Sequence, residues 1–295
     1  MSSQARPEAE HDNPSLPGVL VEGVVRLALE EDLGQAGDVT TRSIIASTTT
    51  GAAKIVAREM GLLAGAQAAT LAFALVDPAL AVRFKVREGS AVARGDVVAT
   101  VEGAAASILT AERTALNFLG HLSGVATATH RLVEAIRGTG AKICCTRKTT
   151  PGLRALEKYA VRVGGGVNHR LGLDGAILIK DNHIAVAGGV APALQAARAS
   201  TGPLTPVEIE VDTLDQLDEA LEEGASVIML DNMPPSVLRQ AVARVNGRAR
   251  LEASGSVTTD TVRAIAESGV EFISSGWITH SAPALDFGLD FSREG

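Results

Sequence analysis

The chain has 295 residues, of which 46% are hydrophobic and only 3% aromatic, and its formal net charge is -7. A chain of this length can bury large cores in about two domains, and the scarcity of aromatic residues favours packed α/β layers over a β-sandwich. The acidic balance argues against a nucleic-acid partner. The sequence has no apolar run near the ~20 residues of a membrane span, and residues 1–17 lack the hydrophobic region of a signal peptide.

Residues 1–17 are instead predicted to form a disordered tail. The two cysteines, Cys144 and Cys145, are adjacent in a strand-like run. This arrangement supports neither a disulfide framework nor a metal site, and it favours a reducing compartment. We therefore expect a cytoplasmic protein.

The first half of the chain has mixed patterns. Hydrophobic periodicity predicts helices at residues 19–31, 64–76, 110–120 and 126–137, and strands at 52–58, 81–86 and 97–102. The hairpin around Glu88-Gly-Ser resembles the turn of biotinyl and lipoyl carrier domains. Those domains display a modifiable lysine at the hairpin tip, whereas Lys85 lies within a strand, so we interpret the likeness as structural.

From residue 141 short apolar runs alternate with helical segments. The runs fall at residues 142–145, 176–179, 207–211, 226–230, 250–253 and 270–273, and the helices at 151–163, 189–199, 213–223, 234–245 and 258–268. This alternation predicts a parallel sheet that is closed or partly closed into a barrel.

Polar residues stand where these strands end. They are Thr146-Arg147-Lys148, Lys180-Asp181, Asp231-Asn232, Ser254-Gly255 and Ser275-Gly276, with Glu210 near the end of its own strand. Burying one unpaired ion costs several kcal/mol, so a core would not collect such groups by chance. In an α/β barrel the carboxyl ends form one rim, which is where active sites lie. A catalytic site at this rim is favoured over a barrel with merely satisfied polar ends.

Cationic side chains are concentrated between residues 142 and 183. They include Arg147, Lys148, Arg154, Lys158, Arg162, His169, Arg170 and Lys180. Arginine binds carboxylates and phosphates with two parallel hydrogen bonds and lysine acts as a point charge, so the mixture indicates a ligand with several anionic groups. We interpret Arg154, Lys158 and Arg162 as a solvated helix face.

The remaining rim residues suggest further roles. Ser254-Gly255 and Ser275-Gly276 offer free N–H groups to a phosphate, with His280 as a possible donor from the same loop. Glu210 and Asp231 suit either Mg²⁺ or ribose hydroxyls, and the alternative is ion pairing with Lys180 or Lys148. Glu208 shares a strand face with Glu210 and is expected to help position it without contacting the ligand.

Several motifs carry a resemblance to a known family. They are EDLGQAGDVTT (31–41), TAERT (110–114), TRKT (146–149), PGLR (151–154), EKYAV (157–161), GGGVNHRLGL (164–173), IKDNH (179–183), EIEVD (208–212), LDN (230–232), EASG (252–255) and THS (279–281). The chain resembles quinolinate phosphoribosyltransferase from about residue 18 onward. The resemblance implies an α/β fold with an N-terminal α/β sandwich domain, at 18–120 and joined by 281–295. It also implies an incomplete, seven-stranded α/β barrel of type II phosphoribosyltransferases at 121–280.

The resemblance also implies an activity. Quinolinate and phosphoribosyl pyrophosphate would react with Mg²⁺ to give nicotinate mononucleotide, pyrophosphate and carbon dioxide, in a homodimer with shared active sites. Arg147, His169, Arg170 and Lys180 would surround the quinolinate carboxylates, with Arg113 entering from the partner subunit. Lys148, Glu210 and Asp231 would be catalytic, the two carboxylates holding the metal. Residues Thr146, Ser254, Gly255, Ser256, Ser275, Gly276, Trp277 and His280 complete the implied substrate-binding set.

Three positions depart from the family pattern. Cys145 stands where the family has Asp, Ser256 replaces a second Gly, and Trp277 replaces a small residue. None is expected to touch reacting atoms. Two alternatives remain: a paralogue of this fold that phosphoribosylates another acidic ring, and a silent barrel that senses a phosphorylated ligand. The intact NHR and TRKT motifs favour quinolinate over the first, and Glu210 and Asp231 beside Lys148 argue against the second.

Overall fold

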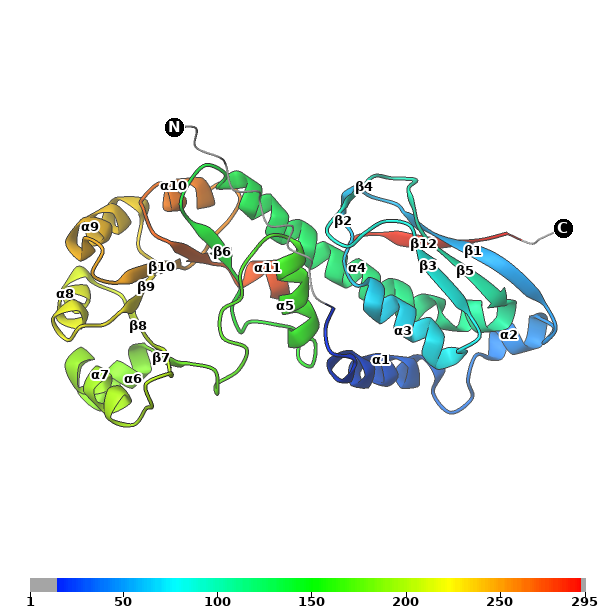
Figure 1. Cartoon of the computed structure of the whole chain (residues 1–295), viewed down its shortest axis with the longest axis horizontal. Helices are drawn as coiled ribbons and strands as arrows, with labels where there is room; N and C mark the ends of the chain where they lie inside the picture. Colours follow the sequence, from blue (N-terminus) through cyan, green and yellow to red (C-terminus); the bar gives the residue numbers. More distant parts are fainter. Residues whose placement is uncertain (1–14, 293–295) are drawn as a thin grey trace, which may run out of the picture.

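The computed structural model describes residues 15–292. Its N-terminal part contains a four-stranded antiparallel sheet in the order β12-β1-β5-β3 (Figure 1). The strands are β1 (Thr50–Ala57), β3 (Ala81–Phe84), β5 (Val97–Ala104) and β12 (Phe287–Ser292). Strands β2 (Gly61–Leu62) and β4 (Ala91–Val92) form a separate short pair. The last strand of the described chain, β12, pairs antiparallel with β1 in this sheet.

Helices pack against this sheet or against one another to make an α/β sandwich (Figure 1). They are α1 (Gly18–Leu33), α2 (Val39–Ile44), α3 (Ala66–Val76) and the N-terminal half of α4 (Ala105–Ala135). The sequence patterns missed α2, which begins where the Asp38 carboxylate accepts a hydrogen bond from the Thr41 amide at 2.8 Å.

Helix α4 corrects one prediction, because it is a single helix of 31 residues instead of two. The predicted gap between residues 120 and 126 contains Gly124, and the first predicted helix ends at Gly120. In the fold these glycines provide room for another segment, since a Cβ on Gly124 would lie 2.1 Å from the Pro283 carbonyl oxygen. The helix runs from the sandwich to the barrel (Figure 1), so the expected boundary between residues 120 and 121 lies within it and stays a prediction.

The second part of the chain forms a parallel sheet of six strands in the order β6-β11-β10-β9-β8-β7. The strands are β6 (Lys142–Cys144), β7 (Ile177–Ile179), β8 (Val207–Val211), β9 (Val227–Asp231), β10 (Arg250–Ser254) and β11 (Phe272–Ser274). Val167 adds one parallel bridge to Cys144, at the place of a seventh strand. Among the described residues, no pairing joins Val167 to β7, so the barrel is incomplete.

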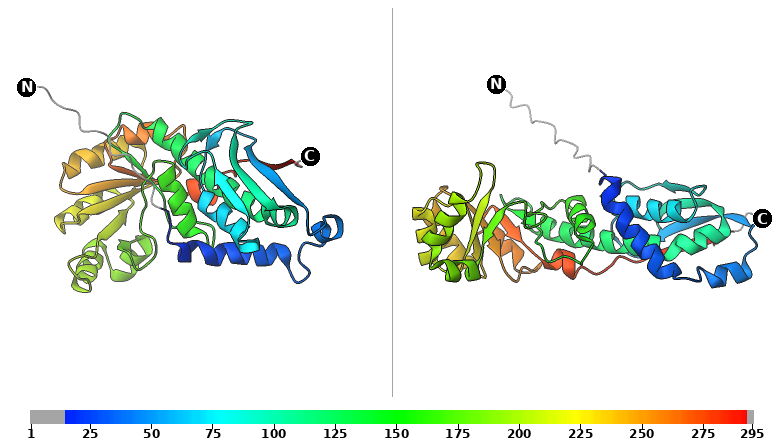
Figure 2. Two further views of the ribbon diagram at one scale, coloured as in Figure 1. Left: turned by 45° about the vertical axis from the view of Figure 1, so that its right-hand side comes forward. Right: turned by 90° about the horizontal axis from the view of Figure 1, so that it is seen from below.

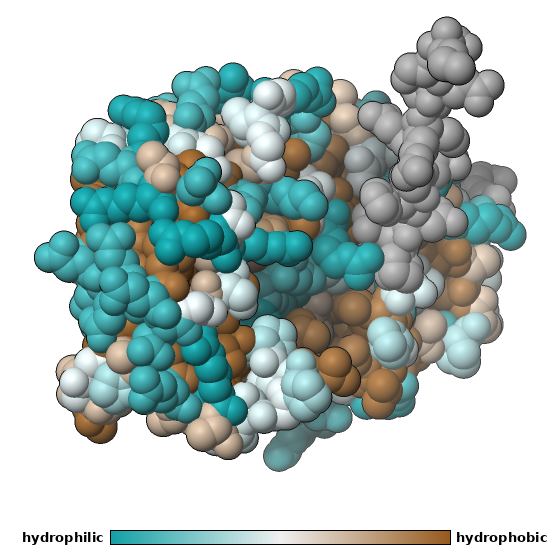
Figure 3. Space-filling view, turned by 60° about the vertical axis from the view of Figure 1, so that its left-hand side comes forward, coloured by the Kyte–Doolittle hydropathy of each residue, from teal (hydrophilic) through white to brown (hydrophobic). Residues whose placement is uncertain are grey.

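Helices surround the outside of the barrel (Figure 2). They are α5 (Arg154–Val163), α6 (Asp181–Ala187), α7 (Val190–Ala199), α8 (Leu214–Glu222), α9 (Pro235–Val245), α10 (Val262–Ala266) and α11 (Trp277–His280). All six strands and five of these helices were predicted within a few residues, and α6 and α11 were missed. The barrel end seen in Figure 3 is hydrophilic over much of its surface, with apolar patches between.

Most of the predicted disordered tail, residues 1–14, lies outside the described residues. Its described end is held to α3, since the backbone N–H and C=O of Leu16 bond to the Gln67 amide at 3.1 and 2.8 Å. Across residues 15–292, none of the helices combines the length and the apolar character needed to cross a membrane.

Candidate active site

A cavity of about 520 Å³ opens at the carboxyl ends of the barrel strands. Eleven of the predicted site residues line it together, from the loop after β6 to the loop after β10. They are Thr146, Arg147, Lys148, His169, Arg170, Lys180, Glu210, Asp231, Ser254, Gly255 and Ser256. Since parallel strands end at one rim, residues more than 100 positions apart in sequence meet here.

Two arginines form the cationic side of this cavity. The Nε atoms of Arg147 and Arg170 are buried and have no hydrogen-bond partner among the described residues. Nη1 of Arg170 donates to the Ala176 carbonyl at 2.7 Å, which fixes the direction of the guanidinium. Burial, and then the like charge of Arg147, lower the pKa of Arg170. A carboxylate between the two guanidinium groups would satisfy the free donors and relieve the repulsion.

His169 lies beside the arginines and is held by protein atoms on both ring nitrogens. Its Nε2 is 2.9 Å from the Glu208 carboxylate, and its Nδ1 accepts the Arg170 N–H at 2.9 Å. The hydrogen bond to Glu208 raises the pKa of His169. Glu208 was expected to support Glu210, but its observed partner is His169.

Glu252 adds a second carboxyl group to this cluster and was not predicted. Its Oε2 lies 4.0 Å from Nε2 of His169, and the residue is only 4% exposed. Burial, and then the charge of Glu208, raise the pKa of Glu252 to about 7. The signal was present in the sequence, because Glu252 precedes Ser254 by two residues on one strand and therefore shares its inner face.

The carboxylates expected at the metal lie on neighbouring strands. Glu210 on β8 accepts a hydrogen bond from Lys180, and Asp231 ends β9. The interpretation of Glu210 as an ion-pair partner of Lys180 is therefore also correct in this structure. Asp231 accepts a hydrogen bond from the Asn232 side chain at 2.6 Å. Two oxygen-donor side chains facing one cavity fit a magnesium ion with few protein ligands.

A second cavity of about 550 Å³ adjoins the first and shares Lys148, Gly255 and Ser256 with it. The four remaining predicted rim residues line this cavity: Ser275, Gly276, Trp277 and His280. Gly276 leaves room for Lys148, since a Cβ at this position would lie 2.9 Å from Cδ of the lysine. Thr279 also holds this loop to Lys148, through a 2.7 Å hydrogen bond to its carbonyl.

Gly255 is needed for a different reason. Its φ of 141° is in a region that side chains rarely adopt, and a Cβ there would lie 2.7 Å from Oδ1 of Asn232. Asn232 itself has a φ of 51°, and its backbone N–H bonds to the Ser254 carbonyl at 2.9 Å. The loops after β9 and β10 therefore fit closely at the mouth of the cavity.

The interpretation of α5 as a solvated basic face is wrong for Lys158 and Arg154. Lys158 is 1% exposed, and its Nζ bonds to the His169 carbonyl at 2.9 Å and to Cys145 Sγ at 3.0 Å. Arg154 is half-buried and bonds to Thr149 at 3.0 Å. Only Arg162 is exposed, as expected. Periodicity alone could not reveal that the loops fold back over this helix.

Arg113 stands apart from the other predicted residues. It is exposed on α4 and lines neither cavity. Its expected entry into a partner subunit stays a prediction.

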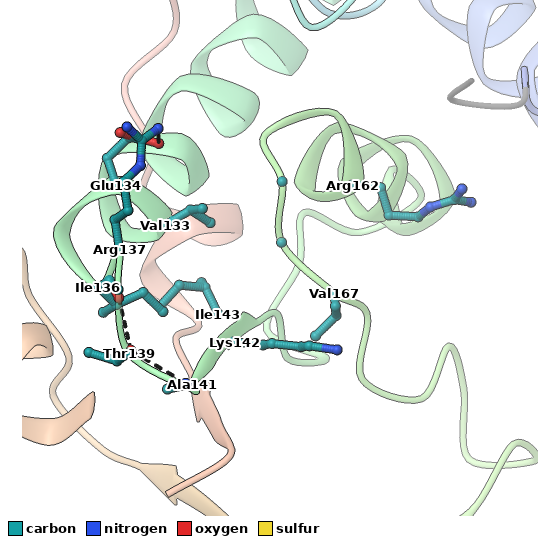
Figure 4. Close-up of a pocket in the computed structure, with 13 residues that line it drawn as sticks. Val133, Glu134, Ile136, Arg137, Thr139, Ala141, Lys142, Ile143, Arg162 and Val167 are labelled. Atoms are coloured by element: carbon teal, nitrogen blue, oxygen red, sulfur yellow. Dashed lines mark hydrogen bonds and ion pairs between the residues drawn. The ribbon is translucent and has the colours of Figure 1, made fainter. Parts of the chain in front are cut away.

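Another cavity, of about 590 Å³, lies at the opposite end of β6 (Figure 4). Its charged residues are the exposed Lys142 and Arg162, together with Glu134 and Arg137, which pair at 2.5 Å. It is slightly larger than the rim cavities. The convergence of buried cations and carboxylates is nevertheless at the rim, so we place the chemistry there.

The rim of this incomplete α/β barrel thus combines cationic side chains, two neighbouring carboxylates and glycine-lined loops. This combination fits an enzyme that acts on anionic, phosphorylated substrates. The family models match accordingly: quinolinate phosphoribosyl transferase, N-terminal domain, over residues 38–123, and C-terminal domain, over residues 125–290. The chain belongs to the quinolinate phosphoribosyltransferase family.

Individual relatives agree with this assignment. The chain is 47% identical over 271 residues to the nicotinate-nucleotide pyrophosphorylase [carboxylating] of Mycobacterium leprae, covering 90% of this chain and 95% of the relative. It is 43% identical to the probable enzyme of that name from Bacillus subtilis, covering 88% and 89%. The structure of the nicotinate-nucleotide pyrophosphorylase from Francisella tularensis is similar, with a TM-score of 0.90, 38% identity, and coverage of 95% and 99%.

Proposed function

We propose that the rim cavity joins quinolinate to phosphoribosyl pyrophosphate and releases pyrophosphate and carbon dioxide, giving nicotinate mononucleotide for NAD biosynthesis. The names of the relatives support this reaction, since a carboxylating nicotinate-nucleotide pyrophosphorylase catalyses it as read in reverse. The observation that carries the proposal is the pair of buried Nε atoms of Arg147 and Arg170. Two guanidinium groups with unpaired Nε donors beside one cavity fit a ring with two adjacent carboxylates.

The residues around the cavity suit the chemistry of this reaction. Departure of pyrophosphate from the anomeric carbon leaves oxocarbenium character on the ribose and negative charge on the leaving group. The carboxylates of Glu210 and Asp231 would stabilise the first, and the ammonium of Lys148 the second. The pyridine nitrogen of quinolinate is the nucleophile, so the reaction requires no protein nucleophile. After the transfer, carbon dioxide leaves and its bonding electron pair stays on the ring carbon, where the adjacent positively charged nitrogen stabilises it. A proton from solvent then adds to that carbon.

Lys180 would act on both substrates, on a carboxylate of quinolinate and, through Glu210, on the ribose. Its ammonium contacts Glu210 and lines the cavity together with Arg147 and Arg170. It would neutralise a quinolinate carboxylate while holding Glu210 toward the ribose. The protein therefore acts mainly by orienting two substrates and by neutralising charge.

Magnesium is part of the proposal. Glu210 and Asp231 would hold the ion, because both offer oxygen ligands from adjacent strands to the same cavity. When bound, Mg²⁺ would neutralise negative charge that develops on the pyrophosphate.

Assembly and location are also proposed. We infer a homodimer in which Arg113 of each subunit reaches the partner's cavity, because this exposed arginine lies outside its own. We place the enzyme in the cytoplasm. Both cysteines are free and buried, in keeping with a reducing compartment.

The test is an assay of the purified protein with quinolinate, phosphoribosyl pyrophosphate and Mg²⁺, following nicotinate mononucleotide. Nicotinate and nicotinamide serve as matched substrates with one carboxylate and with none. We expect product from quinolinate only. Comparable turnover of nicotinate would contradict the role given to the two arginines, and no turnover of quinolinate would contradict the proposed function.

A further inference from the structure

Helix α5 carries three polar side chains that face the loops of the cavity. Arg154, Glu157 and Lys158 are spaced three and four residues apart, so they lie on one side of the helix. Glu157 and Lys158 are buried and Arg154 is half-buried, whereas Arg162 on the same helix is exposed. Helical surfaces that only solubilise a protein do not bury their charges in this way.

Lys158 ties the loop that carries His169 and Arg170 to the end of β6. Its Nζ donates to the His169 carbonyl at 2.9 Å and to Sγ of Cys145 at 3.0 Å. The adjacent Asn168 accepts a further hydrogen bond from Cys145 at 3.3 Å. A buried ammonium is tolerated only where its N–H groups are satisfied. Here its partners are the first residue after β6 and the backbone of the second loop.

Arg154 makes the complementary connection. Its guanidinium donates to the Leu171 carbonyl at 3.2 Å, in the loop of Arg170, and to the Arg147 carbonyl at 3.4 Å, in the loop after β6. A third bond reaches Thr149 at 3.0 Å. The planar, forked guanidinium of one side chain therefore spans the two loops that carry Arg147 and Arg170.

Glu157 connects the same helix to α4. Its Oε2 accepts the Thr150 amide at 3.1 Å, and its Oε1 lies 2.8 Å from Nε2 of His121. Glu157 is 0% exposed, so this contact fixes the far end of the loop after β6 to the long helix.

We propose that Lys158 and Arg154 are positioning residues that set the separation of Arg147 and Arg170, and thereby select a ring with two adjacent carboxylates over a ring with one. The loop of Arg170 has no long strand to fix it, because its sheet pairing is the single bridge at Val167. The α5 side chains supply the missing anchor. This inference rests on the proposed function, since it concerns how the same cavity recognises its substrate.

The main test replaces Lys158 by Met, which keeps the length of the side chain and removes its N–H donors. Displacing a binding group by about 1 Å can cost about 100-fold in rate. We expect Lys158→Met to raise the KM for quinolinate by about tenfold or more, with less than about twofold change for phosphoribosyl pyrophosphate. Arg162→Met is the matched control on the same helix, and its constants should equal those of the wild type.

Binding measurements make the test independent of turnover. Calorimetric titration of benzene-1,2-dicarboxylate and of benzoate into each protein gives the preference for two carboxylates over one. Lys158→Met and Arg154→Met should each reduce this preference by about tenfold, and Arg162→Met should leave it unchanged. Arg154→Met provides the same comparison if Lys158→Met does not fold.

The outcomes separate the two proposals. If the wild type and Arg162→Met turn over quinolinate while folded Lys158→Met and Arg154→Met keep wild-type KM and selectivity, the positioning role is wrong and the proposed function stands. A lowered melting temperature with unchanged selectivity has the same meaning, because it shows a purely structural role. If the wild type itself does not use quinolinate, the proposed function fails, and the dicarboxylate titration still decides whether α5 sets the spacing.

Discussion

Nε2 of His169 lies 2.9 Å from Oε2 of Glu208, and His169 lines the same cavity as Arg147 and Arg170. Because Nδ1 of the same ring accepts the Arg170 N–H, His169 fixes the backbone that carries this arginine. The buried Glu208–His169–Glu252 cluster thus supports the cationic side of the cavity from within the barrel. The raised pKa of the Glu252 carboxyl group also makes the stability of the protein depend on pH.

The first prediction concerns Glu252. Its pKa in the folded protein is about 7, above the ordinary 4.5, so the folded state binds more protons than the unfolded state between these values. The free energy of unfolding should therefore fall as pH rises from about 5 to about 8, by at most about 3 kcal/mol. The raised pKa of His169 acts in the same direction above 6.5.

Urea unfolding of the wild type and of Glu252→Gln across this pH range tests the prediction. The amide resembles the protonated carboxyl group, so the variant should have a flatter profile. Parallel profiles would show that Glu252 does not titrate in this range.

The second prediction concerns the substrate carboxylates. Arg170→Ala and Lys180→Ala should each weaken quinolinate binding by about 1.5–3 kcal/mol, since each removes a hydrogen bond to a charged group. Binding of phosphoribosyl pyrophosphate should change less. Separate titrations of the two substrates measure both effects, and equal losses would contradict this division of the rim.

The third prediction concerns the carboxylates on β8 and β9. Glu210→Gln and Asp231→Asn keep the shape of the side chains but remove charge, so kcat should fall by about tenfold or more while quinolinate affinity changes little. Steady-state assays over a range of Mg²⁺ concentrations measure this, and the requirement for Mg²⁺ should rise in both variants. Wild-type turnover in both would mean that the carboxylates only stabilise the fold.

The fourth prediction uses Trp277, the only tryptophan in the chain. It lines the cavity shared with Lys148 and is 40% exposed. Trp277→Ala should therefore cost about 1–2 kcal/mol of stability, less than a fully buried ring. Phosphoribosyl pyrophosphate should change the emission of the wild type, whereas quinolinate alone should not. Equal responses to both ligands would place the indole outside the phosphate site.

The fifth prediction tests the sharing of active sites. Homodimers of Lys148→Ala and of Arg113→Ala should both be nearly inactive. In a mixed dimer, entry of Arg113 into the partner's cavity places both defects in one site and leaves the other intact. Co-purified mixed dimers should regain activity from one site. Persistent inactivity after confirmed exchange of chains would show that Arg113 does not act in the partner.

The sequence predicted the parts of the site that depend on strand ends. Glu210, Asp231 and Ser254 follow or close apolar runs, and parallel topology alone brings them to one rim. The contacts of Lys158 could not be predicted in this way, because they arise where a long loop folds over a helix. Helical periodicity reports which side chains share a face, and it carries no information on what covers that face.

The long helix α4 shows a similar limit. Glycine weakens a helix in isolation, and Gly120 and Gly124 lie at the end of the first predicted helix and in the gap before the second. Tertiary packing overrides this preference, because the segment at 283–285 lies against these glycines and Leu285 donates its N–H to the Gly120 carbonyl at 2.9 Å. A residue that is unfavourable locally is here required by a contact 160 positions away.

The position of strand β12 near the end of the sequence determines when the N-terminal sheet can be completed during synthesis. The N-terminal sheet receives its edge strand from residues 287–292, which leave the ribosome only after every barrel strand has been made. Until then β1 exposes an unpaired edge, which can pair with strands of other chains. The barrel can therefore begin to fold during translation, whereas the N-terminal sandwich is completed last. During synthesis, protection from aggregation is needed chiefly at the N-terminal sheet, which is made first.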